Sequence, residues 1–214
     1  RGIGLELARQ YSSAGWHVIG TARKPESAQE LKALGAEVMQ LDVTDLASAQ
    51  RLSRELGTRP IDLLINNAGI LPMMRSLEEI DMEEYERVMD VNAVGPVRVT
   101  RSVLPNLRAG QIRKIVNITS TLGSIAQNTS GSFYGYRESK AALNMFTKSL
   151  AADLGPEGFT SIVVHPGWVR TDMGGSNAPT TAEESVRGIR RVIDGLSKAD
   201  NGAFFNFEGE RMPW

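Results

Sequence analysis

The fold of this chain is decided by a short apolar run that ends in a glycine turn, Ile61-Asp62-Leu63-Leu64-Ile65-Asn66-Asn67-Ala68-Gly69. A run of this length and composition predicts a buried β-strand. Similar runs recur along the chain, separated by segments whose apolar residues repeat at helical spacing. The alternation predicts βαβ units, and therefore a parallel sheet covered by helices on both faces.

The expected elements span the whole chain. The strand runs are Val18-Ile19, Val38 to Leu41, Ile61 to Ile65, Ile115 to Ile118, Ile162 to Val164 and Phe204 to Phe207. The helical patterns are Leu5 to Ala14, Ser27 to Leu34, Leu46 to Leu56, Met82 to Leu107, Tyr136 to Leu154 and Ala182 to Gly195. We therefore expect an α/β, doubly wound parallel sheet of the Rossmann type, in a single domain over residues 1–214.

The glycine turn Gly2-Ile3-Gly4 opens the chain without a strand before it. A doubly wound sheet needs a first strand near its centre that feeds this turn. Without that strand, its neighbours would expose unpaired edges. We expect the natural protein to carry roughly ten to fifteen more residues upstream, forming a β-strand and its turn.

Composition excludes several classes of protein. The 214 residues include no cysteine, which excludes disulfides, thiolate catalysis and Cys-bound zinc. The formal net charge is −1, without a block of basic residues, so nucleic acid and membrane surfaces are not the expected partners. His17 and His165 lack metal-ligand spacing, so no metal site is predicted. A cytoplasmic location fits these features.

Two segments predict a dinucleotide phosphate site. Gly2 and Gly4 precede a helix, where the backbone can approach a pyrophosphate, although an ordinary helix-entry turn has the same pattern. The strand near Val18 ends in Arg23 and Lys24 without an acidic residue, which favours NADP(H) over NAD(H). Arg1 would add a second cation for the 2′-phosphate. A solvated loop is the alternative for Arg23-Lys24.

The following strand ends at Asp42-Val43. Asp42 is a candidate acceptor for the adenine amino group. A turn or helix-capping role is the alternative, because Thr44 and Asp45 follow and lead into a helix.

A second group of residues suggests proton-transfer chemistry. Tyr136 and Lys140 are four apart on a predicted helix and share a face, although chance also produces this spacing. A nearby ammonium lowers the pKa of a phenol and would make Tyr136 a general acid. Ser120 follows a strand and would donate to a carbonyl oxygen, with Thr119 and Thr121 as competitors. Asn92 lies within a predicted helix, where Asn is unfavourable unless it has a specific role.

Taken in order, these segments resemble the short-chain dehydrogenase/reductase superfamily over essentially the whole chain. The resemblance is carried by Arg1-Gly2-Ile3-Gly4 (the end of TGxxxGxG), Asp42-Val43, Asn66-Asn67-Ala68-Gly69 (NNAG), Val91-Asn92-Ala93-Val94-Gly95, Tyr136-Arg137-Glu138-Ser139-Lys140 (YxxxK) and Pro166-Gly167-Trp168-Val169-Arg170-Thr171 (PGxxxT). The segment around Gln127 to Phe133 and the ending Pro213-Trp214 look like the C-factor and sniffer-like carbonyl reductases.

The resemblance implies a hydride transfer between NADP(H) and a carbonyl or alcohol, with Tyr136 as acid/base. Lys140 would lower the pKa of Tyr136 and hold the nicotinamide ribose, Ser120 would polarise the carbonyl, and Asn92 would hold a water in a proton relay. The implied cofactor contacts are Arg1, Gly2, Ile3, Gly4, Arg23, Asp42, Val43, Asn67, Ala68, Gly69, Tyr136, Lys140, Pro166, Gly167, Val169 and Thr171.

The substrate and the assembly are less defined by the sequence. Trp168, Met73, Met74, Leu122 and Phe133 would form an apolar pocket for a small carbonyl compound, or else belong to the core or an oligomer contact. The resemblance implies a homodimer or homotetramer. The alternatives are a nucleotide-binding regulatory or signalling protein of C-factor type, or a ketoacyl-thioester reductase. The latter would use a basic patch from Arg98, Arg101, Arg108, Arg113 and Lys114.

Overall fold

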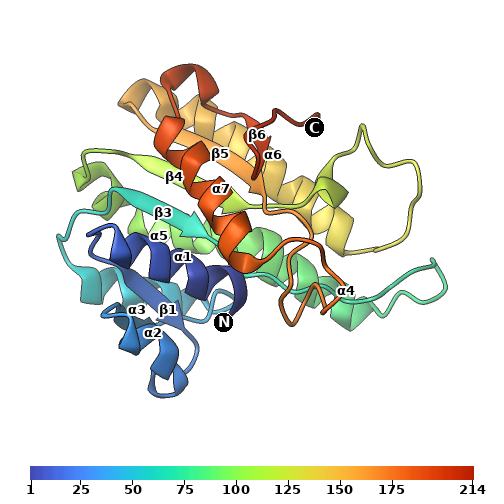
Figure 1. Cartoon of the computed structure of the whole chain (residues 1–214), viewed down its shortest axis with the longest axis horizontal. Coiled ribbons are helices and arrows are strands. Elements are labelled where there is room, and N and C mark those ends of the chain that lie inside the picture. Colours follow the sequence, from blue (N-terminus) through green and yellow to red (C-terminus); the bar gives the residue numbers. More distant parts are fainter.

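The computed structural model describes residues 1–214 as two parallel sheets with helices on both sides (Figure 1). The strands are β1 (Ile19–Ala22), β2 (Glu37–Gln40), β3 (Leu63–Asn66), β4 (Lys114–Ile118), β5 (Thr160–His165) and β6 (Phe204–Asn206). The helices are α1 (Gly2–Ser13), α2 (Gln29–Ala33), α3 (Leu46–Leu56), α4 (Met82–Met89), α5 (Gly95–Ala109), α6 (Tyr136–Leu154) and α7 (Ala182–Gly195). The predicted α/β class is confirmed.

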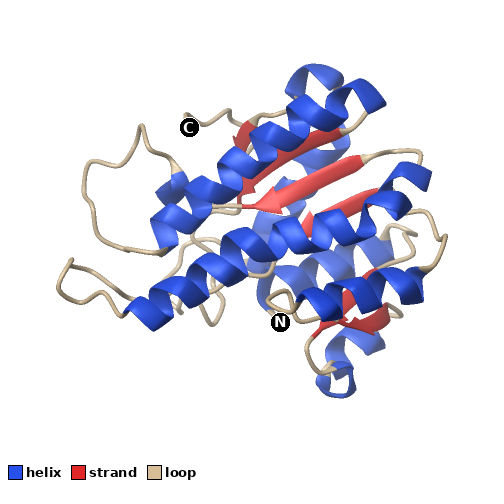
Figure 2. Cartoon of the chain, turned by 180° about the vertical axis from the view of Figure 1, so that it is seen from behind, coloured by secondary structure: helices blue, strands red, loops and turns tan.

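Strand alternation places the core on both sides of the sheet. In β4, Val116 and Ile118 face a cluster with α1 and α7, while Ile115 faces a cluster with α3 and α5. Successive side chains of a strand point to opposite faces, so one apolar run serves both clusters. Figure 2 shows α6 and the α4–α5 run crossing the sheet on the side opposite to α1 and α7.

The sheet is divided into two parts, as expected for a doubly wound sheet described without its first strand. β1 pairs only with β2, and the larger sheet has the order β3-β4-β5-β6. The two parts are joined by side-chain packing, since Ile19 and Leu64 contact the same cluster. Leu64 is only half-buried, whereas its β4 partner Ile115 is fully buried. The predicted upstream strand stays a prediction.

Several predicted boundaries shift. α1 begins at Gly2 rather than Leu5, and a 3-10 turn at Pro25–Ser27 precedes a shorter α2. The long helix expected from Met82 to Leu107 is divided by a π-helical turn, Asp90–Val94. No helix is both long and apolar enough to cross a membrane.

Candidate functional site

The ends of β3, β4 and β5 bring the predicted chemical residues to one edge of the larger sheet. Parallel strands end on the same side, so the segments after Asn66, Ile118 and His165 meet there (Figure 1). The N-terminal turn of α6 lies beside them and supplies Tyr136. This edge is where an open α/β sheet binds ligands.

A buried polar network fixes the strand ends. The Asn66 Nδ2 donates to Asn117 Oδ1 at 2.7 Å, and these residues are register partners in β3 and β4. The Asn117 Nδ2 then donates to Thr147 Oγ1 of α6 at 2.7 Å. Buried amides without partners would be costly, so these bonds fix the position of α6 relative to the sheet. Asn117 and Thr147 could not be predicted from the sequence, because their pairing depends on strand register.

Asn92 is fully buried in the π-helical turn. Its Oδ1 accepts from the Ile70 N–H at 2.8 Å, and its Nδ2 donates to the Ile70 carbonyl at 2.9 Å. The Nδ2 also donates to Ser139 Oγ at 3.1 Å, and Ser139 in turn donates to the Tyr136 carbonyl at 2.8 Å. Asn92 therefore links the loop after β3 to the start of α6. Ser139, for which the sequence predicts no role, connects Asn92 to the Tyr136 carbonyl.

The Ser120 side chain lies close enough to the Tyr136 phenol to lower the pKa of Tyr136. Ser120 Oγ also accepts from the Leu122 N–H at 3.1 Å, which fixes it in a 3-10 turn. Thr119 is occupied elsewhere, because its hydroxyl donates to Asn144 Oδ1 at 2.7 Å. Of the three hydroxyls that follow β4, Ser120 is therefore the one that the structure pairs with the phenol.

The pKa of the Tyr136 phenol is shifted by its surroundings. Burial of the phenol raises its pKa, and the Ser120 side chain opposes this with a smaller effect. The Lys140 Nζ lies 5.7 Å from the centre of the Tyr136 ring, and its hydrogen bond goes to the Ile118 carbonyl at 2.9 Å. The net shift of the Tyr136 pKa is therefore upward, and the expected effect of Lys140 on it stays a prediction.

Lys140 is itself strongly perturbed. Its side chain is buried, with 4% of the residue exposed, and burial lowers its pKa to about 8. A Cβ placed on Gly69 would lie 3.6 Å from Lys140 Nζ and 3.4 Å from Asn92 Oδ1. Gly69, Asn92 and Lys140 are therefore neighbours, and Ser120 and Tyr136 lie at the same sheet edge. The four predicted catalytic positions come together.

The glycine turn and the segment after β5 are also adjacent. Gly2 has a φ of 55°, and a Cβ there would lie 3.3 Å from Thr171 Cγ2. A Cβ on Gly4 would lie 2.7 Å from Asn67 Nδ2, so a larger residue would displace the Asn67 side chain. Arg1 pairs with Asp172 at 2.8 Å, with both side chains exposed. Arg1 thus binds a carboxylate of the segment after β5.

The PGxxxT segment has an irregular backbone held by neighbouring elements. The Pro166 carbonyl accepts from Ser185 Oγ of α7 at 2.6 Å. Gly167 has a φ of 85°, and a Cβ there would meet the Phe207 ring at 2.9 Å. Val169 is buried and bridges to Thr180, which folds the segment back near the start of α1.

Asp42 has the turn role that was the alternative to an adenine contact. Its Oδ1 accepts from the Thr44 N–H at 2.9 Å and from the Thr44 hydroxyl at 2.6 Å. These bonds lower the pKa of Asp42, and Arg23 adds a smaller effect in the same direction. Arg23 is exposed directly after β1, so its guanidinium is accessible near Asp42. Val43 packs against the start of α5 at Gly95.

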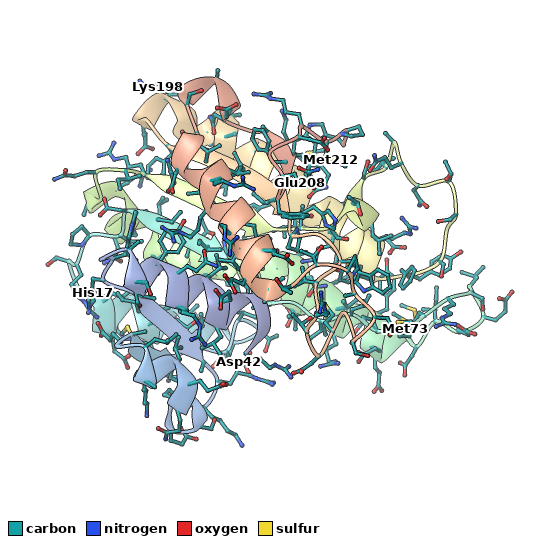
Figure 3. The ribbon with its side chains drawn as sticks, in the orientation of Figure 1. His17, Asp42, Met73, Lys198, Glu208 and Met212 are labelled. Carbon is teal, nitrogen blue, oxygen red and sulfur yellow. The ribbon has the colours of Figure 1, made fainter.

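The predicted apolar pocket is divided between core and surface. Met74 is buried and packs against Gly135, whereas Met73 lies exposed on the projecting loop after β3 (Figure 3). Trp168 is 57% exposed, and its Nε1 donates to the Gly174 carbonyl at 2.7 Å. Leu122 is half-buried in the turn that holds Ser120. Met73 and Trp168 therefore remain available to a ligand, and Met74 does not.

The candidate basic patch is largely engaged within the protein. Arg98 pairs with Asp90, and Arg108 pairs with Glu157, at 2.7 Å in each case. Arg113 donates to three backbone carbonyls, and Lys114 Nζ donates to the Ile193 carbonyl at 2.6 Å. These contacts favour a structural role over a free docking surface.

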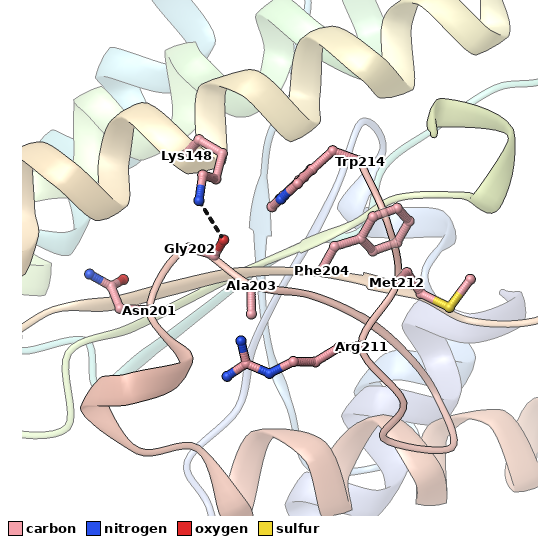
Figure 4. A pocket seen from close by; sticks show the side chains of 8 residues that line it. All are labelled: Lys148, Asn201, Gly202, Ala203, Phe204, Arg211, Met212 and Trp214. Atoms are coloured by element: carbon pink, nitrogen blue, oxygen red, sulfur yellow. Dashed lines mark hydrogen bonds between the residues drawn. The ribbon is translucent and has the colours of Figure 1, made fainter. Parts of the chain in front are cut away.

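Two surface hollows lie apart from these residues. One, of about 180 Å³, is enclosed by the C-terminal segment, and in it Lys148 Nζ donates to the Gly202 carbonyl at 3.3 Å (Figure 4). The other lies between α1 and α7 and is lined mainly by charged side chains. Neither is lined by a predicted catalytic or cofactor residue, so the candidate site stays at the edge of β3, β4 and β5.

Comparison with known proteins shows that the chain belongs to the short chain dehydrogenase family. The family model for short chain dehydrogenase matches residues 1–182. The chain is 50% identical over 157 residues to the C-signal of Myxococcus xanthus, covering 73% of this chain and 95% of that protein.

Two solved structures align with the whole chain. The carbonyl reductase Sniffer of D. melanogaster has a TM-score of 0.92 and 32% identity, with 96% of its chain covered. An NADPH-bound carbonyl reductase from chicken fatty liver has a TM-score of 0.92 and 34% identity, with 95% of its chain covered.

Proposed function

Because the chain belongs to the short-chain dehydrogenase family, we propose that it is an NADPH-dependent carbonyl reductase in which Tyr136 donates the proton. The observation that carries the proposal is the placement of the buried Ser120, Tyr136 and Lys140 side chains together at the ends of the strands, with Lys140 Nζ 5.7 Å from the centre of the Tyr136 ring. Two hydroxyl donors at one point can bind a carbonyl oxygen and stabilise the negative charge that develops on it.

The protein's part of the reaction is proton transfer. A phenol keeps its proton at neutral pH, and burial raises the pKa of Tyr136 further, so Tyr136 is protonated and is the proton donor of the site. Ser120 orients the substrate oxygen, and Tyr136 Oη transfers its proton to that oxygen as the alcohol forms. Lys140 has a pKa of about 8, which lets it return a proton to the tyrosinate near neutral pH. Asn92 fixes the backbone at Ile70 beside Lys140.

The residues present fit a bound NADP(H). The buried Lys140 ammonium makes one hydrogen bond within the protein and has further N–H donors for ribose hydroxyls. The N-terminal turn of α1 offers unpaired amides and a positive dipole to a pyrophosphate. The exposed Arg23 suits a 2′-phosphate. When bound, the cofactor supplies the hydride that reduces the carbonyl carbon.

The NADPH complex of the chicken carbonyl reductase supports this choice of cofactor. The exposed apolar side chains around the site favour an apolar aldehyde, ketone or quinone as substrate. Trp168 and Met173 follow β5, Met73 follows β3, and Ile125 follows β4, and each is at least 48% exposed. Apolar groups on all three loops would cover an apolar substrate and exclude water.

Two other roles remain to be separated from this one. The similarity to the C-signal favours a signalling role as the second candidate. A binding-only protein would not need the Ser120–Tyr136 pair, so loss of that pair discriminates between the two. A ketoacyl-thioester reductase is less favoured, because Arg98, Arg108 and Lys114 already have partners within the protein.

We also propose a homodimer or homotetramer in the cytoplasm, with contacts through α5 and α6. Val94, Val97 and Met145 are exposed apolar residues at the start of α5 and on α6. Light scattering of the purified protein tests the assembly, and a monomer at micromolar concentration would contradict it.

The decisive experiment follows NADPH oxidation with a panel of aldehydes, ketones and quinones. Tyr136→Phe is expected to lower kcat by roughly 10²-fold or more while NADPH binding persists, because only the transferable proton is removed. Tyr11→Phe is the matched control, since Tyr11 is also a buried tyrosine but lies on α1 within the core. Tight NADPH binding without turnover of any carbonyl, and without a difference in Tyr136→Phe, would favour the signalling role.

A further inference from the structure

The segment before α6 has a left-handed backbone. Gly131, Ser132 and Phe133 have φ values of 60°, 63° and 56°. L-residues other than glycine rarely adopt this region, and consecutive ones are especially disfavoured. Such a turn persists only if surrounding contacts hold it in place.

Arg137 supplies those contacts. Its Nε donates to the carbonyls of Gly131 and Ser132, both at 2.9 Å, and its Nη2 donates to Ser130 Oγ at 3.1 Å. The backbone N–H of Arg137 donates to the Phe133 carbonyl at 3.1 Å. One residue therefore binds the carbonyls of all three left-handed residues. The planar guanidinium suits this task, because its donors point in fixed directions.

The same side chain connects this turn to the proposed catalytic pair. Arg137 follows Tyr136 directly, and its Nη1 donates to the Leu122 carbonyl at 3.4 Å. The Leu122 N–H donates to Ser120 Oγ at 3.1 Å. Arg137 thus bridges the turn that positions Ser120 and the left-handed turn that precedes Tyr136.

The left-handed turn also fixes the neighbouring loop. The Tyr134 N–H donates to the Met74 carbonyl at 3.0 Å, which joins the loop after β4 to the loop after β3. Gly135 has a φ of 75° and packs against Val88 and Met74. This packing restricts the backbone conformation at the start of α6. The positions of Phe133 and Tyr134, between the Ser120 turn and Tyr136 in the chain, therefore depend on this turn.

We propose that Arg137 is a positioning residue that shapes the substrate side of the site by holding the 131–133 turn. The proposal rests on the carbonyl reductase function proposed above. Arg137 touches neither the reacting atoms nor the residues that fit the cofactor. It acts through the position of Phe133 and Tyr134, and so on substrates large enough to reach these two residues.

The test compares Arg137→Met with Arg113→Met. Arg113 is a matched control, because it also donates to three backbone carbonyls but lies before β4, at the opposite end of that strand. In Arg137→Met, we expect KM for a bulky apolar ketone to rise about tenfold or more, with kcat for a small aldehyde and the Kd for NADPH nearly unchanged. Arg113→Met should leave all of these values unchanged.

Two further measurements separate positioning from general destabilisation. Adding Ser132→Gly to Arg137→Met should bring the raised KM for the bulky ketone part of the way back to the wild-type value, because glycine tolerates a left-handed φ. Hydrogen exchange at the Tyr134 amide should quicken about tenfold in Arg137→Met and not in Arg113→Met. An equal loss for large and small substrates, or unchanged exchange at Tyr134, would overturn the proposal.

Failure of the proposed function gives a different result. If the wild-type protein reduces no carbonyl, that function is wrong and Arg137 has no role in positioning a substrate. Hydrogen exchange would still show whether Arg137 holds the 131–133 turn.

Discussion

Lys140 gives the folded protein a specific dependence on pH. Its ammonium is buried, and its hydrogen bond goes to the Ile118 carbonyl rather than to a carboxylate. Burial lowers the pKa of Lys140 from 10.5 to about 8. Since the unfolded chain restores the ordinary pKa, folding and protonation of this one side chain are linked.

The sign and size of the effect follow from these two pKa values. Below about pH 8, Lys140 is charged in both states and contributes no slope. Between about 8 and 10.5, the unfolded chain binds the proton and the folded protein does not, so stability rises with pH. The slope is about 1.4 kcal/mol per pH unit, which gives a gain of about 3 kcal/mol across the full window.

The assay is urea unfolding of the wild type and Lys140→Met at several pH values from about 7 to 9.5. The difference between the two proteins cancels the other titrating groups. We expect the free energy of unfolding of the wild type to rise by about 2 kcal/mol relative to Lys140→Met by about pH 9.5. Parallel curves for the two proteins would show that the Lys140 ammonium is solvated, and would refute the reasoning.

Two other substitutions test the cofactor site and the entry to α6. Arg23→Ala should weaken NADPH binding about tenfold and leave NADH binding nearly unchanged, because only NADPH carries the 2′-phosphate; equal losses for both cofactors in a fluorescence titration would remove Arg23 from the phosphate site. Gly135→Ala should lower the free energy of unfolding by about 2–5 kcal/mol, because it combines a left-handed φ with overpacking against Val88. Gly131→Ala is its control in urea unfolding, since Gly131 is also left-handed but its Cβ would meet open space, and equal costs for the two would contradict the packing argument.

Three helices could be predicted from the sequence to the residue. α3, α6 and α7 have the expected bounds, and α7 begins with a capping box of Thr181 and Glu184. The expected long helix was wrong at Asp90–Val94. The π turn there presents Asn92 to Ile70 and Ser139, and these partners are distant in sequence. Local helical periodicity contains no information about them.

The identities of the candidate catalytic residues could be read from motifs, but the electrostatics could not. The spacing of Tyr136 and Lys140 predicts that they share a helix face, because helical geometry is local. The pKa of Tyr136 depends instead on burial and on where the Lys140 ammonium points. Both are properties of the packed site, so the net direction of that shift could not be predicted from the spacing.

What the sequence by itself determined was the alternation of strands and helices, the parallel sheet, and the edge at which Ser120 and Tyr136 meet. These follow from short-range periodicity and from the rule that parallel strands end on one side. Only the tertiary structure decided the Asn66–Asn117 pairing and the contacts of Arg137. Each of these depends on strand register or backbone conformation, which long-range packing sets and no local pattern of residues encodes.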